Sequence, residues 1–76
     1  MIDILKQFGL TDKEIKLYLK LLGLGSVTSG ELMKELNFYS KTVYGILDRL
    51  IDKGLVSYII KSNKKYYEAE NQTLNQ

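Results

Sequence analysis

Few side chains in this sequence of 76 residues could support catalysis. It contains no histidine and no cysteine, so the commonest general base, the commonest metal ligand and the thiolate are all missing. Two carboxylate pairs at helical spacing remain, Asp48 with Asp52 and Glu31 with Glu35. Two carboxylates without loop carbonyls make a poor cation site, so we interpret them as surface charge. We therefore expect no enzyme, no metal site and no cofactor.

Short polar side chains at the start of an amphipathic pattern favour a different chemistry. Between residues 40 and 50, apolar residues recur at helical spacing, which predicts a helix with one packed face and one free face. Polar side chains on such a free face can reach base edges in the DNA major groove. A glycine inside a helix costs about 1 kcal/mol relative to alanine. The presence of Gly45 would be explained by a close approach of another backbone, or equally by drift in composition. The candidate contacts are Tyr39, Ser40, Lys41, Thr42, Tyr44 and Gly45.

The positive charge of the chain is concentrated in one segment. The net charge is only +2, but residues 37–67 contain six cations and two acids. A local surplus of this kind is typical of a surface that faces phosphates, although a solvated face would look the same. Three of the cations could contact the DNA backbone or minor groove, or could merely protect edge strands from aggregation. These three are Lys61, Lys64 and Lys65.

Capping signals divide the first half of the chain into helices. Residues 2–8 predict a short helix closed by Gly9. Thr11 with Glu14 forms one capping box and Thr28 with Glu31 another, so helices are expected to begin at both threonines. The first of these helices should end at Gly23 and Gly25, and the second at Leu36. A turn over 37–39 leads to the helix of about 40–53, which Gly54 should stop in the left-handed conformation.

The second half of the basic segment has the pattern of a β-hairpin. Residues 55–60 and 65–70 are rich in β-formers and flank turn residues at 61–64. Tyr66 and Tyr67 alternate faces on the return strand, and the sequence does not choose which one is buried. The fold class expected is α+β, mainly α: a winged helix-turn-helix with a three-helix core, an N-terminal helix and a two-stranded wing. Residues 1–70 should form this single domain, and 71–76 a polar C-terminal tail.

The same segments resemble the winged helix-turn-helix domain of the TrmB family of archaeal transcriptional regulators. The similarity covers about Phe8 to Tyr67, including the blocks at 9–14, 18–22, 28–32, 42–50 and 53–56. It implies sequence-specific binding to double-stranded DNA. Larger family members carry a sugar-sensing domain after the wing, and we expect no small-molecule effector domain here. The turn at 37–40 departs from the glycine-containing turn and basic residue usual in the family, so the operator sequence does not carry over.

These patterns predict a transcriptional regulator, with the recognition helix of about 40–53 in the major groove and the wing of about 61–65 on the backbone or minor groove. The alternative is a winged helix that contacts another protein without specific DNA binding. We expect a homodimer through Ile2, Ile4, Leu5 and Phe8, unless this apolar segment only caps its own core. With no apolar run of about 20 residues, no membrane association and a cytoplasmic location are expected.

Overall fold

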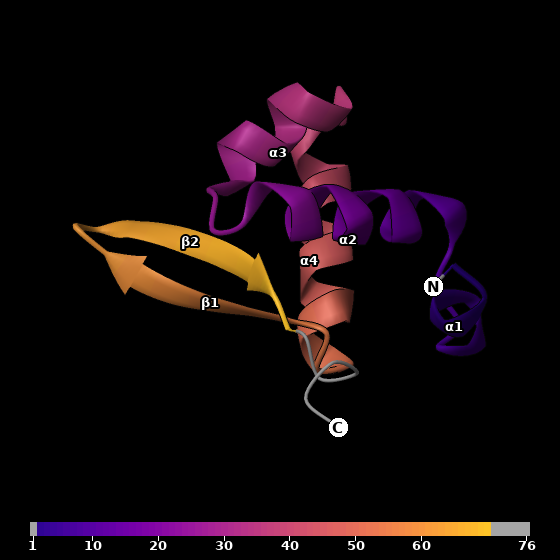
Figure 1. Ribbon diagram of the computed structural model, residues 1–76. Helices are drawn as coiled ribbons and strands as arrows, with labels where there is room; N and C mark the ends of the chain where they lie inside the picture. The colour runs from indigo at the N-terminus through magenta and orange to yellow at the C-terminus, as the bar shows by residue number, and fades with distance from the viewer. Residues whose placement is uncertain (1, 71–76) are drawn as a thin grey trace.

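Residues 2–70 fold into four helices followed by a β-hairpin (Figure 1). The computed structural model describes residues 2–70, and the side chains from Leu5 onward. This order confirms the predicted winged helix-turn-helix of the mainly helical α+β class, while the predicted tail at 71–76 lies outside the described residues. The elements are α1 (Ile2–Gln7), α2 (Asp12–Leu24), α3 (Ser29–Leu36), α4 (Ser40–Asp52), β1 (Val56–Lys61) and β2 (Lys64–Ala69).

Both predicted capping boxes are present. The Thr11 amide donates to Glu14 Oε1 at 2.9 Å, and the Thr28 amide donates to Glu31 Oε1 at 3.3 Å. Each threonine hydroxyl in turn accepts from the amide of its glutamate. The amides at the start of α2 and α3 are therefore satisfied by residues only three positions away, which is why the sequence located both helices.

The prediction that Gly23 helps to end α2 is wrong. Gly23 lies inside the helix, which continues to Leu24 and is capped by Gly25 at φ 87°. A helix interior tolerates glycine at a cost of about 1 kcal/mol, whereas a positive φ favours glycine strongly. The end of α4 follows the prediction, since Gly54 has φ 76° and the Leu55 amide donates to the Leu50 carbonyl at 2.9 Å. This hydrogen bond belongs to a Schellman motif.

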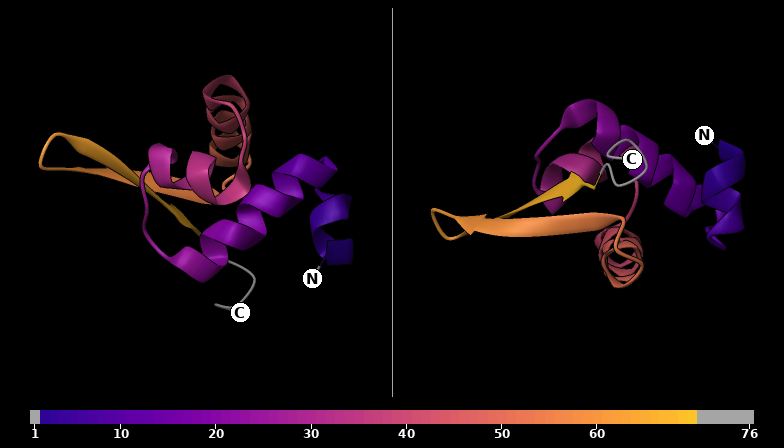
Figure 2. Two further views of the ribbon diagram at one scale, coloured as in Figure 1. Left: turned by 90° about the horizontal axis from the view of Figure 1, so that it is seen from above. Right: turned by 60° about the horizontal axis from the view of Figure 1, so that its bottom comes forward.

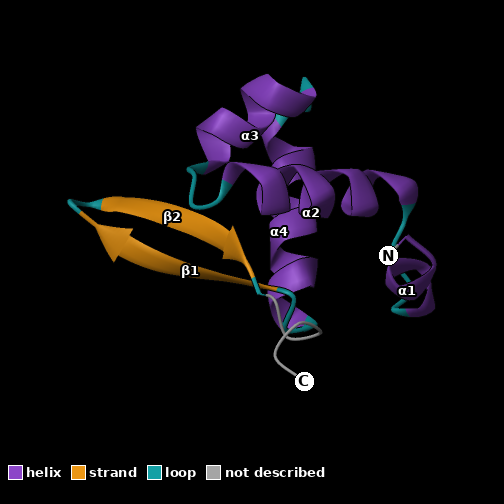
Figure 3. Cartoon of the chain, in the orientation of Figure 1, coloured by secondary structure: helices purple, strands orange, loops and turns teal. Residues whose placement is uncertain are grey.

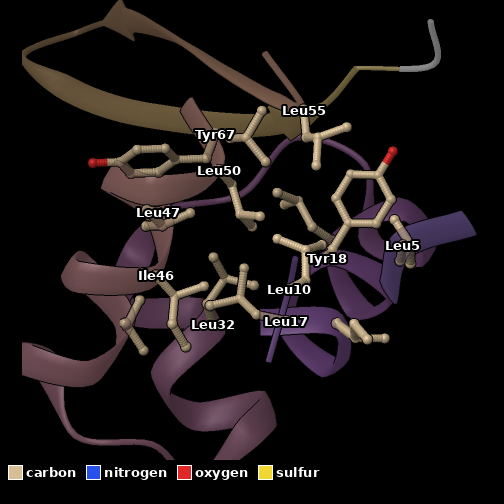
Figure 4. Packing of buried hydrophobic residues seen from close by; sticks show 14 of the residues in the cluster. Leu5, Leu10, Leu17, Tyr18, Leu32, Ile46, Leu47, Leu50, Leu55 and Tyr67 are labelled. Atoms are coloured by element: carbon tan, nitrogen blue, oxygen red, sulfur yellow. The ribbon is translucent and has the colours of Figure 1, made fainter. Parts of the chain in front are cut away.

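The core lies where α2 crosses α4, with α3 packed against both (Figures 1 and 4). The apolar residues predicted to form one packed face between residues 40 and 50 belong to α4, and all of them are buried. In Figure 4 the side chains of Leu17, Leu32 and Leu50 gather between the helices, and the Tyr67 ring closes the side under the hairpin. The fully buried side chains are Leu17, Leu21, Leu32, Val43, Leu47 and Leu50.

The apolar N-terminal segment is divided between the core and the surface. Leu5 is only 4% exposed and belongs to the core, whereas Phe8 is 42% exposed. The side chains of Ile2 and Ile4 lie outside the described part of the chain. Leu5 therefore packs into the core of its own domain, and of the two side chains of this set that are described, Phe8 is the one exposed to solvent.

The hairpin turn is tighter than predicted. Lys61 and Lys64 end the two strands opposite one another, so the turn consists of Ser62 and Asn63 instead of all four residues at 61–64. Both turn residues have positive φ, 53° and 65°, as a type I′ turn requires to match the twist of its strands. Figure 3 shows the resulting pair of long strands.

One extra bridge fixes the base of the hairpin to the helices. Val27 and Tyr67 exchange two backbone hydrogen bonds, of 3.0 Å and 2.7 Å. Tyr67 is 5% exposed and Tyr66 is half-buried, so the structure makes the choice between the two tyrosines that the sequence left open. Among residues 2–70, no helix combines the length and apolar character needed to cross a membrane.

Candidate nucleic-acid interface

The exposed face of α4 changes charge along its length. Lys41, Gly45, Asp48 and Asp52 are all exposed, and their spacing places them on one ridge opposite the buried side chains. The single cation lies in the first turn, and both acids lie in the last two turns. A polyanion is therefore attracted to the N-terminal half of α4 and repelled by its C-terminal half.

The start of α4 is not capped by a side chain. Its N-cap residue is Tyr39, which forms no capping hydrogen bond, and its first turn contains no acid. The first amides of a helix have no partner within the helix, and they carry the positive end of its dipole. Tyr39 is 86% exposed, so this end of the helix is open to a negatively charged ligand. Of the three main helices, α2 and α3 have capping boxes and α4 does not.

Two of the six cations counted in residues 37–67 are held by the protein itself. Arg49 Nε lies 2.6 Å from Glu14 Oε2 of α2, and Lys53 Nζ donates to the Phe8 carbonyl at 2.9 Å. Both contacts direct the side chains toward the α1–α2 side of the helix. The basic surface that we expected from the sequence is therefore reduced to Lys41, Lys61, Lys64 and Lys65, which are all exposed.

The hairpin presents different groups on its two faces, and it projects away from the helices (Figure 2). In the cross-strand register, Tyr58 pairs with Tyr67, and Ile60 with Lys65, on the face toward α4. Lys65 Nζ lies 4.3 Å from the centroid of the Tyr58 ring, and the Tyr58 and Tyr67 rings are 5.9 Å apart. Lys61 lies apart from this cluster, in a depression lined by Ser26, Ile59, Lys61, Ser62 and Tyr66.

A groove of about 420 Å³ separates the helices from the hairpin. It is lined by Thr28 and Ser29 at the start of α3, Tyr44 of α4, and Lys64, Lys65 and Tyr67 of β2; we call it the α3–wing groove. On its helical side, Ser29 Oγ donates to Tyr44 Oη at 2.8 Å. The sequence identifies Thr28 only as a capping residue and does not single out Ser29, because no local pattern relates the two to Tyr44.

The hydroxyl groups of Tyr44 and Tyr67 can donate hydrogen bonds to a ligand in the α3–wing groove. Burial raises the pKa of the Tyr67 hydroxyl above its usual 10, and the neighbouring Tyr44, Asp48 and Tyr58 raise it further. The phenol therefore stays protonated at neutral pH and can act as a donor. Tyr44 is 48% exposed, so its own hydroxyl proton can reach a ligand while its oxygen accepts from Ser29.

The residues predicted to contact DNA fall into three places. Tyr39, Ser40 and Lys41 are exposed at the start of α4, with Thr42 half-buried beside them. Tyr44, Lys64 and Lys65 meet at the α3–wing groove, while Lys61 lies in the other depression. A Cβ atom added at Gly45 would meet no atom of the described residues within 4 Å, so packing among these residues does not require glycine there.

The described part of the chain contains no group of three or more acidic, histidine or cysteine side chains placed to hold a metal ion.

Comparison with known proteins identifies one matching family model, described as the sugar-specific transcriptional regulator TrmB, over residues 5–72. No curated protein sequence matches the chain. A solved protein from the thermoacidophilic archaeon Sulfolobus tokodaii is 30% identical, with a TM-score of 0.78; the match covers 90% of this chain and 69% of that one.

Two further structures share the fold at lower identity. A mutant MarR from E. coli, complexed with operator DNA, is 22% identical with a TM-score of 0.80, and the match covers 93% of this chain and 53% of MarR. The S. aureus MepR–DNA complex is 21% identical with a TM-score of 0.78, covering 93% and 61%. The chain thus spans little more than half the length of these MarR-type proteins.

Proposed function

Because the chain belongs to the TrmB family, whose members are transcriptional regulators and not enzymes, we propose that it binds double-stranded DNA sequence-specifically. It would act as a homodimer in the archaeal cytoplasm and regulate transcription. The observation that carries this function is the open start of α4, which lies on the same molecule as a hairpin with three exposed lysines. An uncapped, acid-free helix start attracts phosphate, and a helix fits the major groove.

The charge gradient on α4 sets how this helix would enter DNA. Ser40, Lys41 and Thr42 would lie at the base edges, while Asp48 and Asp52 hold the C-terminal half away from the phosphates. The hairpin lysines would contact the backbone or the minor groove on the side of α4 that faces the wing. The MarR–operator and MepR complexes have the same fold, and we extend their partner class, duplex DNA, to this chain.

The salt dependence of binding to random duplex DNA should correspond to four phosphate-neutralising cations per protomer, instead of the six cations present in residues 37–67. Non-specific affinity is expected at about 10–100 μM at physiological salt, tightening as salt falls. Each neutralised phosphate contributes about 0.9 to the slope of log affinity against log salt, so the slope should approach about 3.6 per protomer. Fluorescence anisotropy over a salt series measures both quantities. A chain that binds no duplex at low salt would contradict the proposed function.

The recognition helix and the hairpin should make separable contributions. Lys41→Ala and Thr42→Ala are expected to change sequence preference, since a good base-edge contact discriminates by about 1–3 kcal/mol. Lys64→Ala, Lys65→Ala and Lys61→Ala should weaken binding about equally on all sequences, because phosphate contacts carry no direct sequence information. Selection from random duplex DNA followed by sequencing compares the variants. Hairpin variants that alter preference while helix variants do not would refute this division.

Exposed apolar residues on the hairpin favour a second candidate function, binding of another protein. Ile59 is 53% exposed and Ile60 is 69% exposed, and apolar side chains of this size are usual at protein interfaces. A protein-interaction module would have little duplex affinity at any salt concentration, so the same salt series separates the two functions.

A further inference from the structure

The α3–wing groove brings together donors and cations from three separate elements. Tyr44 comes from α4, Ser29 from α3, and Lys64 with Lys65 from β2. The Ser29–Tyr44 hydrogen bond of 2.8 Å fixes the position of the phenol oxygen relative to α3. The groove therefore has a fixed hydroxyl on its helical side and the Lys65 ammonium on its hairpin side, whereas Lys64 is paired with Lys61 and directs its side chain to the other face of the hairpin.

Tyr44 lies to one side of the ridge of α4 that would face the base edges. At 100° per residue, it lies about 60° around the helix axis from Lys41, and its hydroxyl is engaged with the start of α3. A side chain turned toward the flank of the recognition helix meets the strand that borders the major groove, where the nearest ligand atoms are phosphate oxygens. This placement differs from the base contact that the sequence suggested for Tyr44.

We propose that the α3–wing groove binds a single phosphate of the DNA backbone, with Tyr44 as a hydroxyl donor and Lys65 as the neutralising cation. This inference rests on the function proposed above and assigns the partner of one part of that site. Ser29 is a positioning residue, because it acts by holding the Tyr44 oxygen. Flexible lysines supply point charges that suit a phosphate better than the planar edge of a base.

One carboxylate and one aromatic ring lie near the cation of the groove. Asp48 lies close enough to contribute to the raised pKa of Tyr67, and the Lys65 ammonium lies over the Tyr58 ring at 4.3 Å from its centroid. The Lys65 ammonium is thus the cation on the groove side of the hairpin that can neutralise the single negative charge of a backbone phosphodiester.

Tyr44→Phe should lower affinity for a selected duplex and for random duplex by the same factor, about three- to tenfold, because one charge-assisted hydrogen bond is lost. Ser29→Ala should have a smaller effect of the same kind. The opposite depression offers matched controls that remove the same atoms, Tyr66→Phe and Ser26→Ala, and both should leave affinity unchanged. Thermal melting of each variant verifies that the fold is retained.

Replacing single phosphates of the selected duplex by neutral methylphosphonates locates the contact. The wild-type chain should lose affinity at one phosphate per half-site, and the Tyr44→Phe variant should be much less sensitive at that phosphate alone. A variant that changes sequence preference, or that responds to every methylphosphonate as the wild type does, overturns the phosphate assignment. A wild-type chain that binds no duplex overturns the proposed function instead.

Discussion

Leu5→Asp should unfold the chain, whereas Phe8→Asp should keep the fold and separate the proposed dimer into monomers. Leu5 is 4% exposed. Truncating a buried leucine costs about 2–5 kcal/mol, and an unpaired buried carboxylate adds to that loss. A domain of 76 residues has a total stability of only about 4–11 kcal/mol. Phe8 is 42% exposed, and its carbonyl is held by Lys53 independently of its side chain.

Circular dichroism melting and sedimentation equilibrium at tens of micromolar protein measure the two effects. Leu24→Asp is a matched control, since Leu24 is also exposed, at 38%, but ends α2 on the far side from Phe8. It should leave both fold and assembly intact. An intact chain that is monomeric, or a Phe8→Asp variant that remains dimeric, would remove this interface. A two-fold dimer would otherwise present its recognition helices about 34 Å apart, which matches successive major grooves.

Glu14→Ala should destabilise the fold by about 2–3 kcal/mol, much more than Glu31→Ala at the equivalent position of α3. Both glutamates complete capping boxes. Glu14 is 5% exposed and its second oxygen also pairs with Arg49 of α4 at 2.6 Å, whereas Glu31 is exposed and has no such cation in the described residues. Truncating Glu14 thus removes a cap and the tie between α2 and the recognition helix.

Urea unfolding of the two variants gives the comparison, with about 0.5–1 kcal/mol expected for Glu31→Ala. The Glu14 and Arg49 double-mutant cycle should show a coupling of only about 1 kcal/mol, because the Arg49 side chain is 55% exposed and solvent screens the ion pair. Equal losses at the two capping boxes would mean that the link to α4 contributes no stability.

The parts of the fold that sequence analysis predicted correctly depend on residues that are close together in the chain. Thr11 and Glu14 are hydrogen-bonded to each other three residues apart, and so are Thr28 and Glu31. Gly54 adopts a positive φ because it ends α4 in a Schellman motif. Periodicity located the buried face of α4 for the same reason. Two local predictions are wrong by a small margin: Gly23 lies inside α2, and the hairpin turn has two residues instead of four.

The candidate site was only partly predictable, because its composition depends on where distant elements meet. The sequence showed six cations in one segment, but not that Lys53 would be held by a carbonyl 45 residues away or Arg49 by a carboxylate of α2. It also showed the hydroxyls of Ser29 and Tyr44 without relating them. The family resemblance indicated the class of function, but it did not show which lysines line the α3–wing groove and which line the depression on the other face of the hairpin.

The sequence by itself determined the elements, their order and their ends, since hydrogen-bonded caps, left-handed glycine and apolar periodicity are properties of short stretches of backbone. Only the tertiary structure decided that Leu5 and Tyr67 are buried while Phe8 and Tyr58 are exposed, and that Ser29, Tyr44 and Lys65 line one groove. Burial and charge pairing act over a few ångströms in space regardless of separation along the chain, so packing of the helices and the hairpin had to bring these side chains together first.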